Sequence, residues 1–304
     1  MRFYQHSGRC GIMGVPMAAA AGAVAALVLG AAYTFATNWV PFVYLNCLLT
    51  LGSGALVGVA VTWGARMGKI RNMPIALAVG GAAGVLAVYF AWVFDPMARF
   101  SDINQPIWDV QILWEYMKLG YEKGFWSIGH SGGAVTGVVL AGVWVVEAGL
   151  IIAASVFLVH ALLRDKPFCE EMEQWTTTEH DAVQLSLVDD DAVDAKLQRL
   201  VHGDLDVLGE FYLGEDDDMA VLCLDLTTSP GCSVCNFLTV RCVRTVMNKK
   251  GKPSKSVDAL LTNLQLTPEE VAMVRAAGVP RWAEALAPEV DAEAELERES
   301  QVQA

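Results

Sequence analysis

The chain has 304 residues, of which 54% are hydrophobic, and its mean hydropathy of +0.39 is too apolar for one soluble domain. Its formal net charge of −13 at pH 7 argues against a nucleic-acid-binding protein, because such proteins need a basic patch. The long apolar runs lie within residues 11–163 and most charges within residues 164–304. The sequence therefore predicts a membrane domain followed by a soluble one.

The first apolar run covers residues 11–36 and follows Arg2 and Arg9. A cleaved signal peptide is the rival interpretation, but its apolar core is usually about 7–15 residues long. A run of about 20 residues or more can span a bilayer. We therefore expect a retained membrane helix, followed by further spans at residues 41–64 and 74–94.

Small residues recur at every fourth position in the first three spans, which places them on one face of each helix. Such a face lets a neighbouring backbone approach closely. Simple richness in glycine and alanine is the alternative explanation. The glycines expected at helix contacts are Gly14, Gly22, Gly30, Gly54, Gly58, Gly80 and Gly84.

Residues 95–133 are too polar to span a bilayer and are predicted to form an extracytoplasmic loop. Within this loop, apolar residues of segment 106–121 recur at spacings of three and four, which predicts an amphipathic helix. We expect this helix to lie along the membrane interface, with a ligand-binding loop as the alternative. A fourth span is predicted at residues 134–163.

The orientation follows from the basic residues. Arg66, Lys69 and Arg71 lie in a short loop after the second span, and Arg164 and Lys166 follow the fourth. Short cytoplasmic loops carry an excess of Lys and Arg. The sequence thus predicts an all-α four-helix bundle in the cell membrane, with both termini and the soluble domain in the cytoplasm.

Glu147 lies near the middle of the fourth span, where a lone carboxylate is costly unless it faces protein or water. Burial disfavours the charged form, so we expect a neutral carboxyl at pH 7 in the absence of a cation or water. The structural interpretation is a hydrogen bond to a neighbouring helix, with Thr50 or Ser53 as partner. The functional interpretation is a proton or ion site.

The soluble part is predicted to be a small α+β domain, residues 164–285, followed by an acidic tail at residues 286–304. Thr267-Pro268-Glu269-Glu270 is a strong helix start, with a Thr cap, Pro at the first position and Glu at the third. The predicted strands cover residues 180–187, 219–226 and 236–246, and a helix is predicted at 190–203.

Cys232 and Cys235 form one C-x-x-C motif, which is half of a zinc site or a dithiol. Cys169 is the expected third ligand, because a cysteine at position 172, where Met172 stands, would have completed a second such motif. The candidates for a fourth ligand are Cys223, Cys242 and His180, although both of these cysteines fall on predicted strands. Unligated thiols remain the alternative.

We expect a non-enzymatic, membrane-anchored interaction or assembly module whose cytoplasmic domain binds a partner. One alternative is a small transporter or channel subunit that uses Glu147. Another is a membrane-anchored zinc or thiol protein that uses Cys232 and Cys235. The expected partners are the lipid bilayer and a second copy of the chain or another membrane protein, and nucleic acid is excluded.

Overall fold

The computed structural model describes residues 2–40, 43–126, 133–187, 192–214, 218–248 and 252–278. The chain divides into two compact units, which are His6–Lys166 and a soluble unit made of Met1–Gln5 and Pro167–Ala304. The first five residues therefore belong with the soluble unit, although all of His6–Lys166 separates them from the rest of it in sequence. The predicted tail at residues 286–304 lies outside the described residues.

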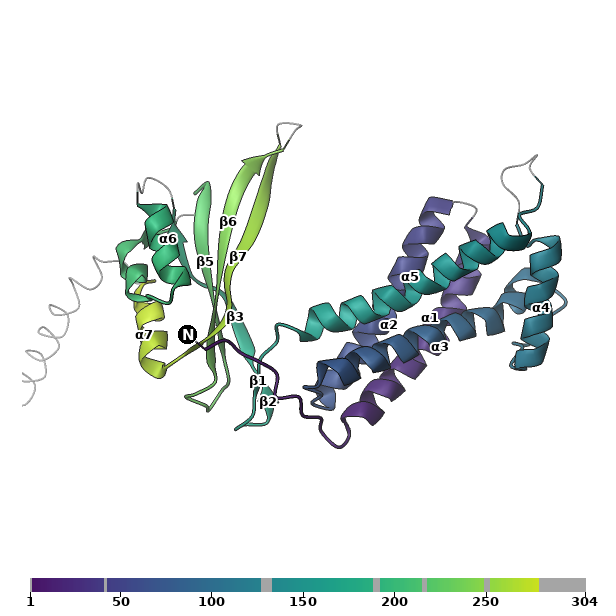
Figure 1. Ribbon diagram of the computed structural model, residues 1–304, viewed down its shortest axis with the longest axis horizontal. Coiled ribbons are helices and arrows are strands. Elements are labelled where there is room, and N and C mark those ends of the chain that lie inside the picture. The colour runs from purple at the N-terminus through teal and green to yellow at the C-terminus, as the bar shows by residue number, and fades with distance from the viewer. Residues whose placement is uncertain are drawn as a thin grey trace, which may run out of the picture. The chain divides into compact units, whose positions relative to one another are not determined.

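Four helices are long and apolar enough to span a membrane. Their most apolar windows have mean hydropathies of 1.7 to 2.2. The third helix continues past the predicted end at Phe94 as far as Arg99, which brings Asp95 into its last turns. The four helices are α1 (Gly14–Trp39), α2 (Val43–Met67), α3 (Met73–Arg99) and α5 (Gly137–Leu163) (Figure 1).

Small residues mark the places where these helices touch. A Cβ atom built on Gly54 of α2 would lie 2.9 Å from Ile151 Cα of α5, and one on Gly84 of α3 would lie 3.0 Å from Ile152 Cα. On α1, a Cβ at Gly30 would lie 2.8 Å from the carbonyl oxygen of Ala87 on α3. Added side chains would meet neighbouring helices or loops at 3.0 Å or less at Gly14, Gly22, Gly30, Gly54, Gly58, Gly80 and Gly84.

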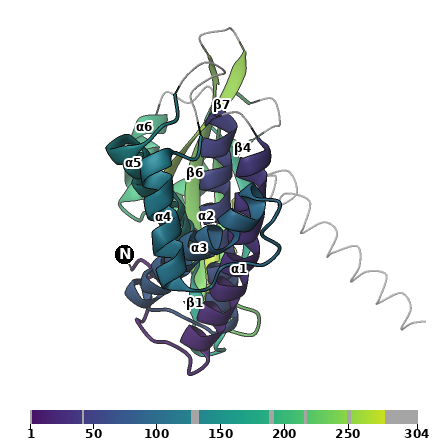
Figure 2. The same ribbon diagram turned by 90° about the vertical axis from the view of Figure 1, so that its right-hand side faces the viewer.

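The polar connection between α3 and α5 contains α4 (Val110–Lys123). Asp109 caps this helix, because its carboxylate accepts hydrogen bonds from the backbone N–H groups of Gln111 and Ile112. The helix begins four residues later than position 106, where the apolar pattern predicted it. It lies across the long helices rather than alongside them (Figures 1 and 2).

The soluble unit contains a five-stranded antiparallel sheet with the strand order β4-β3-β5-β6-β7. A separate two-stranded hairpin precedes it, formed by β1 (Phe168–Cys169) and β2 (Gln174–Trp175). The strands of the sheet are β3 (Thr177–Ser186), β4 (Tyr212–Leu213), β5 (Ala220–Thr228), β6 (Asn236–Met247) and β7 (Pro253–Leu266).

One face of this sheet carries the hydrophobic core of the soluble unit. Leu222, Leu224 and Leu226 alternate along β5 and pack with Leu238 and Val240 of β6. Three helical elements cover the same face and contribute buried side chains to the core (Figure 1). They are α6 (Val193–Val201), the 3₁₀-helix η1 (Asp206–Glu210) and α7 (Pro268–Ala276).

The start of α7 confirms the capping box predicted from the sequence. The Thr267 hydroxyl accepts from the Glu270 backbone N–H at 3.2 Å, and the Glu270 carboxylate accepts from the Thr267 N–H at 2.6 Å.

The strand β7 was not predicted. Asn263 has a left-handed backbone with φ of 53°, which interrupts the alternation of apolar side chains by which a strand is recognised. The edge of β7 is itself paired with the start of the chain. Tyr4 donates its N–H to the Asn263 carbonyl at 3.0 Å, and Gln265 donates to the Arg2 carbonyl at 2.8 Å.

Candidate functional site

The cysteine residues of interest lie in a short hairpin and in the connection between two strands of the sheet. The β1–β2 hairpin pairs Cys169 with Gln174, and the connection between β5 and β6 carries Cys232 and Cys235. The Gln174 side-chain amide joins the two turns, because it donates to Ser229 Oγ at 3.0 Å and to the Pro230 carbonyl at 3.2 Å.

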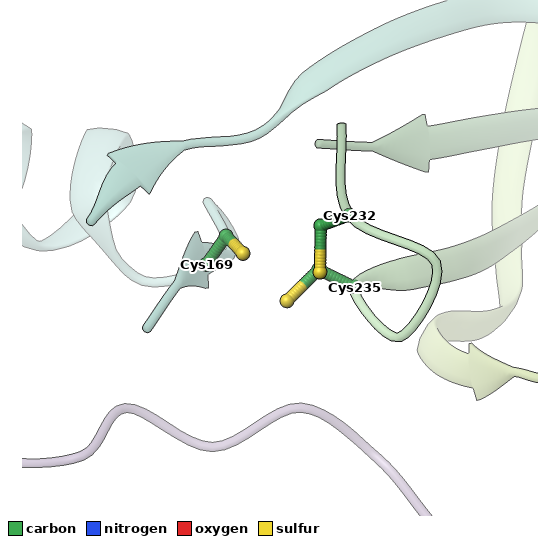
Figure 3. Close-up of side chains that lie close together, drawn as sticks. All are labelled: Cys169, Cys232 and Cys235. Atoms are coloured by element: carbon green, nitrogen blue, oxygen red, sulfur yellow. The ribbon is translucent and has the colours of Figure 1, made fainter. Parts of the chain in front are cut away.

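The structure brings together the thiols of Cys169, Cys232 and Cys235, which the sequence analysis named as candidate metal ligands. Their Sγ atoms all lie within 4.8 Å of one another, and the side chains point toward a common space (Figure 3). A tetrahedral zinc ion with Zn–S distances of about 2.3 Å holds its sulfur ligands about 3.8 Å apart. Small side-chain shifts would therefore let one ion bind all three sulfur atoms.

The thiols differ in how readily they lose a proton. Burial opposes ionisation of Cys169, but hydrogen bonds from the Cys235 thiol, the Met172 backbone N–H and other neighbours hold its pKa below the ordinary value. Burial raises the pKa of the Cys235 thiol, and its hydrogen bond to Cys169 raises that pKa further. The site therefore supplies one acidic thiol, and thiolate is the form that binds metal.

The carboxylate of Glu171, in the turn between β1 and β2, contacts the cluster. The Cys232 thiol donates to Glu171 Oε2 at 3.1 Å. Within the described residues, no further His, Cys, Asp or Glu ligand atom lies within 4.8 Å of all three sulfur atoms. Rotation of Glu171 toward the sulfur atoms would complete a closed tetrahedral site. Glu171 was not among the predicted ligands, because its contact with Cys232 depends on the packing of two segments that are 61 positions apart in sequence.

The three candidates named from the sequence as a fourth ligand lie elsewhere. Cys242 is part of the hydrophobic core, and His180 Nδ1 lies 3.6 Å from Asp225 Oδ2. Cys223 faces the other side of the sheet, where burial, followed by its hydrogen bond to Asp181, raises the pKa of its thiol to about 11. None of them is near enough to join the three-cysteine group.

A polar cluster occupies that other face of the sheet. Asp225 is 4% exposed, yet burial does not neutralise it, because Arg241 donates from Nε and Nη2 at 2.8 Å and the Asp181 backbone N–H donates at 2.8 Å. These interactions hold the pKa of Asp225 below its ordinary range. The charges of Asp225 and Arg241 are paired and hydrogen-bonded, which indicates a structural role for this cluster.

Glu147 of α5 meets a partner that the sequence analysis did not name. The Tyr33 hydroxyl of α1 donates to Glu147 Oε1, and the same hydroxyl lies 3.1 Å from Thr50 Oγ1 of α2. Thr50 therefore reaches Glu147 only through Tyr33. The other proposed partner, Ser53, has a buried hydroxyl with no hydrogen-bond partner in the described part of the chain.

A cavity of about 80 Å³ adjoins Glu147. Its polar lining comes from α1, α3 and α5 and consists of Tyr33, Thr34, Thr37, Asp95, Arg99 and Glu147. Trp144 also lines it, and its ring meets Trp92 edge to face at 5.0 Å. A water molecule needs about 10–15 Å³ measured this way, so the cavity has room and hydrogen-bonding groups for several.

Comparisons with protein-family models, with curated proteins and with solved structures found no match to this chain.

Proposed function

We propose that this protein is a non-enzymatic, membrane-anchored assembly module whose soluble domain binds a zinc-type metal ion through Cys169, Cys232 and Cys235. The observation that carries the proposal is the convergence of these three thiols from two turns that are about sixty residues apart in sequence. Glu171 is the fourth ligand in this proposal, because its carboxylate already lies 3.1 Å from the Cys232 sulfur.

The metal would fix two exposed apolar side chains beside it. Met172 is 46% exposed, and Val234 is 50% exposed within the C-x-x-C turn. The two turns adjoin, since a Cβ built on Gly231 would lie 3.5 Å from Met172 Cε. An apolar surface on rigid turns suits a protein partner, because little conformational freedom is lost on binding.

If all four candidate helices span a membrane, the segments before the first and after the last lie on the same side, and the basic loop at residues 66–71 supports the cytoplasmic side for both. We therefore assign the soluble domain to the cytoplasm. In that compartment thiols stay reduced, which favours metal binding over a disulfide.

The test is metal analysis of the full-length protein, purified in detergent without chelators. We expect about one zinc ion per chain, and loss of that zinc in the Cys232→Ser and Cys169→Ser variants. Cys223→Ser is the matched control, because this buried thiol lies outside the cluster, and it should keep the metal. Equal zinc content in Cys232→Ser and the wild type would rule the site out.

The partner surface has its own test. A photo-crosslinking residue at position 234 should capture a cytoplasmic protein in cells, and chelation should abolish this capture. The same residue at Val201 of α6, which is 41% exposed away from the thiols, provides the control. Capture of equal strength at the two positions would contradict a metal-fixed surface.

A further inference from the structure

The cavity beside Glu147 is polar at a depth where the surrounding solvent would be lipid. Glu147 lies near the middle of α5, and the cavity joins it to Asp95 and Arg99 in the last turns of α3. Unsatisfied polar groups are costly in hydrocarbon, and carboxyl groups inside membrane helices commonly serve proton or ion pathways. The question is whether the hydrogen bonds at Glu147 suit one charge state or two.

The hydroxyl groups next to Glu147 form a chain of hydrogen bonds whose donor and acceptor roles can reverse. Thr50 donates to the Asn46 carbonyl at 2.8 Å, so its oxygen is left to accept. When Glu147 is ionised, the Tyr33 hydroxyl donates to it. When Glu147 is protonated, it can donate to the Tyr33 oxygen, and Tyr33 can then turn its proton to Thr50 Oγ1 at 3.1 Å. Both charge states are thus hydrogen-bonded without any backbone movement.

The other charged groups of the cavity are already paired. Asp95 accepts from Arg99 Nε at 2.7 Å, from the Tyr116 hydroxyl at 2.6 Å and from the Asn38 side chain at 3.4 Å. In the described part of the chain, Glu147 makes no ion pair. The groups that face Glu147 are the phenol of Tyr33 on α1 and, across the cavity, Asp95 and Arg99 on α3, whereas α2 offers the neutral Thr50 through Tyr33.

We propose that Glu147 is a reversible proton-binding site within the membrane domain. The proton reaches the carboxylate through the cavity, which has room for several water molecules, from the side of the membrane on which the connection containing α4 lies. Tyr33 and Thr50 are positioning residues, since they supply a hydrogen bond to either form of the carboxyl. This site is independent of the proposed metal site, because it lies in the other compact unit.

The test uses N,N′-dicyclohexylcarbodiimide on the full-length protein in sealed vesicles. This reagent reacts with a protonated carboxyl in apolar surroundings: the acid proton moves to a reagent nitrogen, and a carboxyl oxygen bonds to the central carbon. The O-acylisourea then rearranges to a stable N-acylurea with no loss of atoms. Mass spectrometry of the peptide that contains Glu147 measures the modified fraction.

We expect modification of Glu147 that falls as the pH is raised, responds only to the pH on the α4 side, and is absent in Glu147→Gln. Tyr33→Phe should raise the pH of half-modification by roughly one unit, because the carboxylate loses a stronger hydrogen bond than the neutral carboxyl does. Thr34→Val is the matched control. Thr34 follows Tyr33 and also lines the cavity, but its hydroxyl donates to the Ala91 carbonyl and not to Glu147. The Thr34→Val variant should therefore keep the wild-type profile.

Three results would overturn the proposal. They are no modification at any pH, modification that does not depend on pH, and identical profiles for the wild type and a folded Tyr33→Phe variant. The last would leave Glu147 with a purely structural hydrogen bond between helices. Elution of each variant as a single species in size-exclusion chromatography shows that it is folded.

Discussion

Glu171 is the residue that decides whether the three-thiol cluster is a closed metal site. Glu171→Gln removes the charge but keeps the shape, so we expect the three thiolates to retain the ion and to lose it more readily to a chelator. Competition with a chromophoric chelator measures this loss. Glu170→Gln makes the same charge change one residue earlier and is the control. If both variants release zinc at the wild-type rate, the fourth ligand comes from elsewhere.

Arg241 is expected to stabilise the sheet through Asp225. Arg241→Met leaves a nearly buried carboxylate without its cation, and removing one partner of a buried pair costs about 3–5 kcal/mol. Because the Arg241 side chain is 27% exposed, we expect the low end of that range. Pulse proteolysis of the full-length protein in urea measures the change. Arg244→Met, an exposed arginine on the same strand, should change stability little.

The same ion pair gives a pH dependence with a definite sign. Since the folded-state pKa of Asp225 is lowered, its stabilisation is present above the unfolded value of about 3.9 and is lost as the pH falls through the lower folded value. The difference in stability between the wild type and Arg241→Met should therefore shrink in acid and stay constant above about pH 5. A difference that grew in acid would contradict this assignment.

At the scale of elements, α2 offers a glycine at a helix contact, Gly54, and a glycine outside any contact, Gly52. A Cβ at Gly54 would overlap the backbone of Ile151, whereas one at Gly52 would meet nothing within 4 Å. Gly54→Ala should therefore destabilise the protein by about 1–3 kcal/mol through overpacking. Gly52→Ala should be neutral or slightly stabilising, because alanine favours a helix. Thermal unfolding in detergent compares the two, and equal melting temperatures would contradict the contact.

Short stretches of sequence predicted those elements that are marked by a long apolar run or by a capping sequence. The apolar runs gave the four candidate spans, and the Thr-Pro-Glu-Glu sequence gave the start of α7. The β1–β2 hairpin was missed because strands of two residues have no periodicity, and β7 because Asn263 breaks its alternation. Tyr33 could not be assigned to Glu147, since a contact between residues 114 positions apart depends on tertiary packing.

At the scale of the whole molecule, the pairing of Arg2–Tyr4 with β7 bears on topology. These residues precede α1, and β7 follows α5, so the segments before the first span and after the last belong to one folded unit. A unit of this kind can form only if both segments lie on the same side of the membrane. Four spans meet that condition because four is an even number, whereas three spans would leave the two segments on opposite sides.

The proposed topology predicts which inserted epitopes an antibody can reach in intact cells. An epitope between Asp102 and Ile103, after α3, should be stained by antibody in intact cells. Epitopes at the C-terminus and between Lys69 and Ile70, after α2, should be stained only after the membrane is permeabilised, because we propose that the basic loop and the soluble domain both lie in the cytoplasm. Staining of the C-terminal epitope in intact cells would place the soluble domain outside. Its thiols would then face oxidising conditions, which favour a disulfide over bound zinc.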